Sequence, residues 1–105
     1  MISLFKKHKE PEASRLNRIA RNSDIEKRIQ NIADHEFKRF IFLAEKEAIN
    51  GRTSLIFDLR FENKYKSFAN QITYKFSRRL YDEGFIYTRH LLTDPNRFTV
   101  HFSNY

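Results

Sequence analysis

One segment constrains the fold more than any other, because residues 23–49 carry apolar side chains at intervals of mostly three or four positions. This spacing places them on one face of an α-helix. Ser23 and Glu26 fit the capping box that begins a helix, and Asn50-Gly51 offers a left-handed stop. A helix of about 26 residues would measure about 39 Å, more than the width of a compact domain of this size. Its apolar positions include Ile25, Ile29, Ile32, Phe37, Phe40, Ile41, Ala44 and Ala48.

The residues before this helix are strongly basic. Residues 1–21 hold six basic and two acidic side chains, a net charge of +4, whereas the other 84 residues hold 14 basic and 11 acidic ones, a net charge of +3. We expect the first ten residues to form a mobile basic arm that ends near Pro11. A short helix is expected over residues 12–21, with Pro11 at its first turn and with Arg15, Arg18 and Arg21 along one stripe.

Shorter elements are expected after Gly51. The apolar run of residues 54–59 predicts a buried strand, and the spacing of apolar residues over 65–80 predicts a second helix that ends at Gly84. Two strands over residues 85–92 and 97–103, joined by Thr93-Asp94-Pro95-Asn96, predict a β-hairpin. In the last strand, apolar residues alternate with polar ones, so we expect one face to pack in the core and the other to face solvent.

These elements predict a chain of the α+β class in the order α-β-α-β-β. The expected architecture is a two-layer sandwich, with a three-stranded sheet covered by two helices and a basic N-terminal arm in front. We divide the chain into an arm with a short helix, residues 1–22, and a single α+β domain, residues 23–105. A length of 105 residues allows one domain, and eleven Phe and five Tyr supply its core.

Residues that could support catalysis are few. The chain has no Cys, and its two glycines, at 51 and 84, cannot form a phosphate-binding loop. Asp58 and Glu62-Asn63-Lys64 superficially match a nuclease metal set, but only three residues separate them, whereas that set spans two strands. With a two- or four-residue turn, His90 and His101 could lie near each other on the hairpin, but they would have no carboxylate partner. We therefore expect no enzyme activity, no cofactor and no metal.

The cationic surface is the main functional signal. It combines the arm, the arginine stripe and the outer face of the second helix, where Tyr74 and Tyr81 could stack on bases. Contacts between these cations and phosphates would give salt-sensitive binding to DNA or RNA without sequence readout. The predicted binding residues are Lys6, Lys7, Lys9, Arg15, Arg18, Arg21, Lys75, Arg78 and Arg79. A winged-helix fold would need two helices within residues 60–83, which hold only one comfortably.

The stripe formed by Ile25, Ile29 and Ile32 supports an alternative hypothesis. It lies in the first turns of the long helix, where the core of a small domain need not reach. The short helix over residues 12–21 could cover it, and so could a second copy of the chain or a host or viral protein. In the last two cases these isoleucines would form a protein interface.

The run from about residue 36 to 103 resembles small uncharacterised α+β proteins of phages and prophages. The resemblance rests on Ala48-Ile-Asn-Gly51, Leu55-Ile-Phe57, Leu80-Tyr-Asp-Glu-Gly-Phe85 and Phe98-Thr-Val-His-Phe102. It implies a viral accessory or virion-associated protein that binds a host protein or nucleic acid, and it implies no catalytic residue. Because no apolar run approaches the roughly 20 residues of a membrane span, we expect a cytoplasmic protein, in the host cytoplasm if it is viral.

Overall fold

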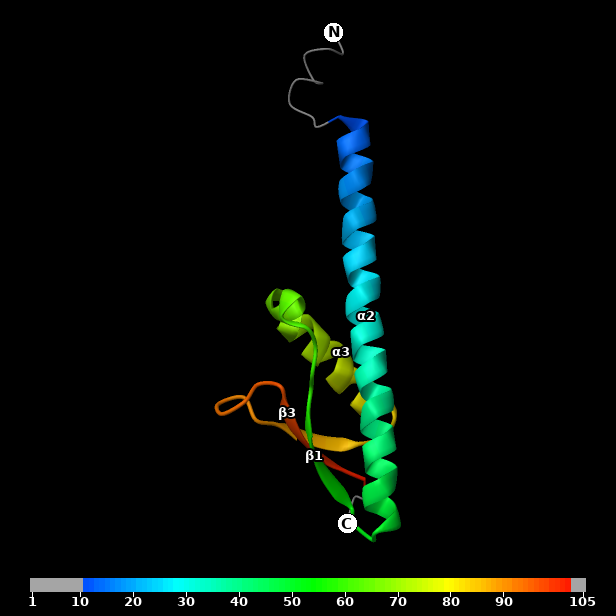
Figure 1. Ribbon diagram of the computed structural model, residues 1–105, viewed down its shortest axis with the longest axis vertical. Coiled ribbons are helices and arrows are strands. Elements are labelled where there is room, and N and C mark those ends of the chain that lie inside the picture. The colour runs from blue at the N-terminus through cyan, green and yellow to red at the C-terminus, as the bar shows by residue number, and fades with distance from the viewer. Residues whose placement is uncertain (1–10, 103–105) are drawn as a thin grey trace.

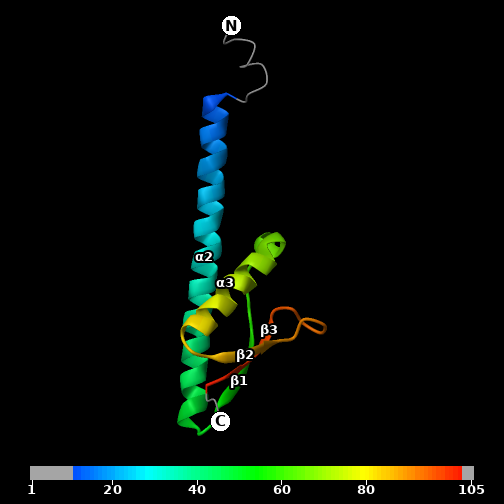
Figure 2. The ribbon, with the colours of Figure 1, turned by 180° about the vertical axis from the view of Figure 1, so that it is seen from behind.

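A single long helix dominates the computed structural model, which describes residues 11–102 (Figure 1). This helix, α2 (Glu12–Ile49), has 38 residues and measures about 57 Å at 1.5 Å per residue. The two shorter dimensions of the molecule are only 25 Å each. The first third of α2 therefore extends beyond the folded body, as the view from behind in Figure 2 also shows.

α2 is continuous through Asn22-Ser23-Asp24, so the expected short helix over residues 12–21 and the expected new start at Ser23 are both wrong. The helix begins after Pro11, whose carbonyl accepts a hydrogen bond from the backbone N–H of Arg15 at 3.0 Å. Extending an existing helix adds a hydrogen bond for each ordered residue, whereas a new start repeats the costly nucleation step. The boundary drawn between residues 22 and 23 falls inside this helix.

Both helices end on a glycine, as predicted. Gly51 has a φ of 82° and donates to the carbonyl of Ala48 at 2.9 Å, while the N–H of Arg52 reaches the carbonyl of Glu47 at 3.0 Å. This pair of bonds is the Schellman motif, which satisfies carbonyls that the helix end would otherwise leave free. α3 (Ala69–Asp82) ends in the same way at Gly84, which has a φ of 86°.

Three antiparallel strands form one sheet in the order β1-β3-β2. β1 (Ser54–Asp58) and β2 (Ile86–Arg89) lie on either side of β3 (Arg97–His101). A 3₁₀ helix, η1 (Asn63–Phe68), leads from the segment after β1 directly into α3. The predicted α+β class, with two helices and a three-stranded antiparallel sheet, is confirmed.

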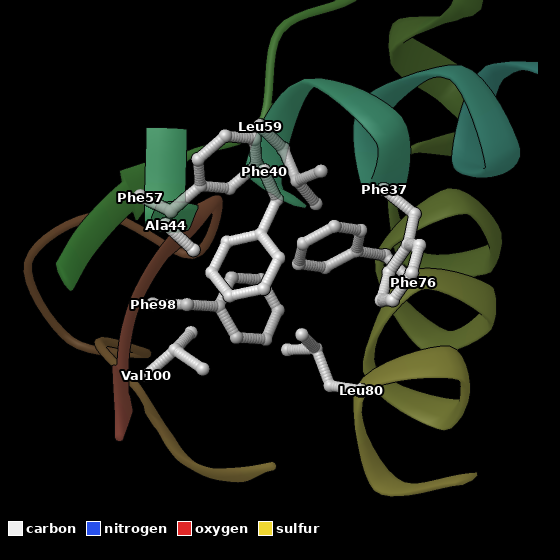
Figure 3. Close-up of a cluster of buried hydrophobic side chains, with 9 residues drawn as sticks. All are labelled: Phe37, Phe40, Ala44, Phe57, Leu59, Phe76, Leu80, Phe98 and Val100. Carbon is white, nitrogen blue, oxygen red and sulfur yellow. The ribbon is translucent and has the colours of Figure 1, made fainter. Parts of the chain in front are cut away.

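The core combines side chains from both helices, from β1 and β3 and from Leu59, and phenylalanine rings fill most of it (Figure 3). Phe40 of α2 meets Phe57 of β1 at 5.5 Å between ring centroids, and Phe57 stacks on Phe76 of α3 at 5.4 Å. Phe98 of β3 is the direct cross-strand partner of Phe57 and meets Phe76 at 5.2 Å. Each such aromatic pair contributes about 0.5–1.5 kcal/mol beyond area burial.

Candidate nucleic-acid interface

The first turns of α2 have no cover from the rest of the described chain. Every residue from Pro11 to Asp24 is exposed, Ile25 is half-buried, and Ile29 is the first fully buried position. We call residues 12–24 the overhang; at 1.5 Å per residue it is about 20 Å long. Its printed ion pairs run along α2 itself, as between Arg15 and Glu12 at 2.8 Å and between Asp24 and Arg28 at 3.2 Å.

A line of seven side chains, four of them arginines, runs along α2 from the overhang onto the body. Its positions follow alternating steps of three and four residues, which keep them on one helix face. Three of its members, Ile25, Ile32 and Arg39, are half-buried, so the line borders the face that packs on the body. We call it the basic stripe, and its members are Arg18, Arg21, Ile25, Arg28, Ile32, His35 and Arg39.

A shallow groove lies at the lower part of the basic stripe. It has a volume of about 250 Å³ and lies between α2 and the segment that leads from β1 into η1. Ile32, Phe61 and Tyr65, all half-buried, give it an apolar lining, and His35 and Arg60 stand at its border, both exposed.

A buried carboxylate holds the far wall of this groove in place. Glu36 is only 3% exposed and accepts hydrogen bonds from the Arg39 guanidinium at 2.8 and 2.9 Å. It also accepts one from the backbone N–H of Arg60, while Arg39 donates to the backbone carbonyl of Asp58. The hydrogen bond to Glu36 raises the pKa of Arg39 above its already high ordinary value. This network ties residues 58–60 to α2.

The three predicted cations of α3 lie beside a different row of α2. Lys75 pairs with Glu26 at 3.9 Å, and Arg79 pairs with Asp34 at 3.5 Å. Arg79 also pairs with Glu83 at 3.4 Å and Arg78 with Asp82 at 3.3 Å. Three basic groups thus face four carboxylates, so this side of the molecule has no excess of positive charge to attract a phosphate backbone.

The remaining predicted site residues are divided between different places. Lys6, Lys7 and Lys9 lie outside the described residues. Arg18 and Arg21 belong to the basic stripe, and Arg15 lies beside them, where it bonds to Glu12 at 2.8 Å. The structure does not bring the α3 cations onto this face.

The isoleucine stripe is covered largely by the protein itself. Ile29 is 0% exposed, and Ile25 and Ile32 are half-buried. The helix over residues 12–21 does not fold back over them, because it is the straight continuation of α2 (Figure 1). The large apolar side chains that the overhang exposes are instead Leu16, at 56%, and Ile19, at 50%.

The residues weighed for metal chemistry have other partners. Asp58 binds Arg97 at 2.8 Å, and Glu62 pairs with Lys64 at 3.4 Å. Within residues 11–102, no group of three or more His, Asp or Glu side chains could hold a metal ion. In the same part of the chain, no helix combines the length and the apolar character that crossing a membrane requires.

Comparison with known proteins found no relative of this chain. Family models, curated proteins and solved structures were all compared with the chain, and none of them matches it.

The sequence prediction missed Arg28, His35 and the aromatic groove. The first two follow the spacing of Arg18 and Arg21 across Asn22-Ser23-Asp24, so a helix carried through that segment would have revealed them. The groove had no such local signal, because Phe61 and Tyr65 reach Ile32 only through the fold.

Proposed function

We propose that this protein is a non-enzymatic binding protein that contacts the phosphates of DNA or RNA through the basic stripe of α2. The observation that carries the proposal is the course of the stripe, which places Arg18, Arg21 and Arg28 on one face of a helix that leaves the body. A row of guanidinium groups on a projecting rod can follow a phosphate backbone without steric hindrance from the domain.

The charge around the stripe supports the same choice of surface. From Arg21 to the end of the stripe and around the groove, five basic residues (Arg21, Arg28, Arg39, Arg60 and Lys64) face three acidic ones (Asp24, Glu36 and Glu62). The α3 side has the opposite balance, so the proposed phosphate contacts do not include Lys75, Arg78 and Arg79. We infer that the body, as the predicted two-layer sandwich in the order α-β-α-β-β, serves to hold α2 in position.

The test is a fluorescence anisotropy titration of a labelled oligonucleotide at about 50 and 200 mM salt. Wild-type protein should bind less tightly at the higher salt. A plot of log K against log salt has a negative slope, and changing both Arg21 and Arg28 to Ala should reduce its magnitude by about 2, or about 1 per lost phosphate contact. Absence of binding to DNA and to RNA at the lower salt would overturn the proposal.

A matched control is available on the same helix. Lys27 and Lys38 are exposed and lie eleven residues apart, so they share a face of α2 that is turned away from the stripe. Changing both to Ala removes the same two charges and should leave the slope close to that of the wild type. An equal loss in both double variants would show that net charge, and not the stripe, governs binding.

The exposed side chains of Leu16 and Ile19 favour protein binding as a second candidate function. Each lies two positions before an arginine of the stripe, so they point away from it. A host or viral protein could bind here while the stripe stays free. In a pull-down after nuclease treatment, changing both residues to Asp should release such a partner. We also propose, from the resemblance to phage proteins, that the protein acts in the cytoplasm of a host cell.

A further inference from the structure

The basic stripe ends at a groove whose chemistry differs from that of a phosphate site. Arg21, Arg28 and His35 are each seven residues apart, so the stripe leads from two guanidinium groups to an imidazole at the border of the groove. Beside His35 the lining is apolar, with Ile32 from α2 and the rings of Phe61 and Tyr65 from the segment after β1. A strand held by the two arginines would next meet these rings.

The size and polarity of the groove limit what it can hold. Its volume of about 250 Å³ is just below the range of about 300–1,000 Å³ that takes drug-sized ligands, so it suits a single flat ring system. Asn31 offers both a donor and an acceptor at the border, and Arg60 offers donors. An apolar lining with hydrogen-bonding groups at its edge matches a nucleobase.

The charges beside the groove are compatible with an anionic ligand. Its two carboxylates already have cationic partners, Glu36 with Arg39 at 2.8 Å and Glu62 with Lys64 at 3.4 Å. The Lys64 ammonium also lies 5.3 Å from the centroid of the Tyr65 ring. A positive charge therefore stands next to the ring on which a base would stack.

We propose that the groove formed by Ile32, His35, Phe61 and Tyr65 takes one unstacked base of a single-stranded nucleic acid whose phosphates lie on the basic stripe. This inference rests on the proposed function and narrows its ligand from any nucleic acid to one with an accessible base. Bases in a duplex are stacked on both faces and cannot enter the groove, whereas single strands can splay a base onto an aromatic ring.

Three probes of equal length test this inference by anisotropy at about 50 mM salt: a single strand, its duplex and an abasic strand with the same backbone. The single strand should bind more tightly than the other two. Changing Tyr65 to Leu should weaken binding of the single strand by about 5-fold to 150-fold and should leave binding of the abasic strand unaffected. Tyr65→Phe, which keeps an aromatic ring, should bind the single strand as the wild type does. Phe42 is 58% exposed and lies outside the groove, so Phe42→Ala is the matched control.

Cross-linking of the unaltered protein covers the case in which a Tyr65 variant fails to fold. Ultraviolet light joins a 5-iodouracil oligonucleotide to an aromatic ring stacked on it, and peptide mapping should place the bond at Phe61, Tyr65 or His35. Cross-links confined to Tyr74 and Tyr81 of α3 would overturn the inference. Equal and salt-dependent affinity for all three probes would also overturn the inference, but it would leave the proposed phosphate binding intact. Absence of binding to every probe would overturn the proposed function itself.

Discussion

The carboxylate of Glu36 and the guanidinium of Arg39, one helical turn apart on α2, form a two-bond ion pair with distances of 2.8 and 2.9 Å. Glu36 is 3% exposed, whereas the Arg39 side chain is 27% exposed and lies over the ring of Phe57 at 4.3 Å. The pair thus reaches from the core to the border of the groove. Glu36 also accepts a hydrogen bond from the backbone N–H of Arg60, which borders the groove. The same carboxylate therefore stabilises the fold and holds one wall of the candidate site in place.

Replacing Glu36 with Ala should lower the free energy of unfolding by about 3 kcal/mol. The change leaves the Arg39 guanidinium and the Arg60 N–H without their buried acceptor, and breaking one half of a buried pair costs about 3–5 kcal/mol; the partial exposure of Arg39 places the loss near the lower end. Urea unfolding measures it. Glu45→Ala, at an exposed position of the same helix, should change stability by less than about 0.5 kcal/mol. Similar values for the two variants would contradict a structural role for the pair.

The ion pair between Asp58 and Arg97 should make stability depend on pH in the acid range. Hydrogen bonding to Arg97 lowers the pKa of Asp58, so the unfolded chain binds this proton more readily than the folded one. The pair therefore stabilises the fold above the ordinary Asp pKa of about 3.9, and its contribution is lost as the pH falls through the lower native value.

The Asp58 side chain is 42% exposed, so we expect only about 0.5–1 kcal/mol from this pair at neutral pH. Urea unfolding of the wild type and of Asp58→Asn should differ by that amount at pH 7. The difference should shrink towards zero in acid. A difference that stays constant across this range would rule out the assigned linkage.

Phe76 should be among the most costly residues to truncate. Its ring is 0% exposed and lies 5.2–5.4 Å from those of Phe57 and Phe98, so Phe76→Ala removes contacts with two strands and leaves a cavity. A loss of about 3–5 kcal/mol is expected in urea unfolding. Phe42→Ala removes the same atoms from an exposed position and should cost far less; a comparable loss would mean that burial does not set the difference.

The overhang should exchange its amide hydrogens much faster than the rest of α2. Its side chains lack tertiary cover, and an isolated helix of this length is marginal in water. Hydrogen exchange should therefore show little protection over residues 12–22 and strong protection near Phe40. Added single-stranded nucleic acid should slow exchange in the overhang if the basic stripe binds it. Unchanged exchange at saturation would place the contact elsewhere.

Features with a local cause were predictable from sequence, and features that depend on distant contacts were not. Gly51 and Gly84 end their helices as predicted, because a left-handed residue after a helix is a local preference. The break expected at Ser23 was also a local inference, but it failed because continued helix growth outweighs one capping box.

The candidate site shows the same division. The spacing of Arg15, Arg18 and Arg21 predicted that they share one side of a short helix, and they lie in the first turns of the continuous helix α2. However, a sequence does not show that Lys75 and Arg79 meet Glu26 and Asp34 of another helix. The charge of the α3 face could therefore be judged only after the two helices were seen together.

The overhang also bears on how such a chain can evolve. From Ile29 onward α2 contributes buried side chains, and a substitution there risks the fold, whereas residues 12–24 touch little of the described body. The same helix thus joins a segment whose side chains are needed for packing to one that can change its charge pattern at small cost in stability. New binding preferences could arise in the overhang while the phenylalanine core stays as it is.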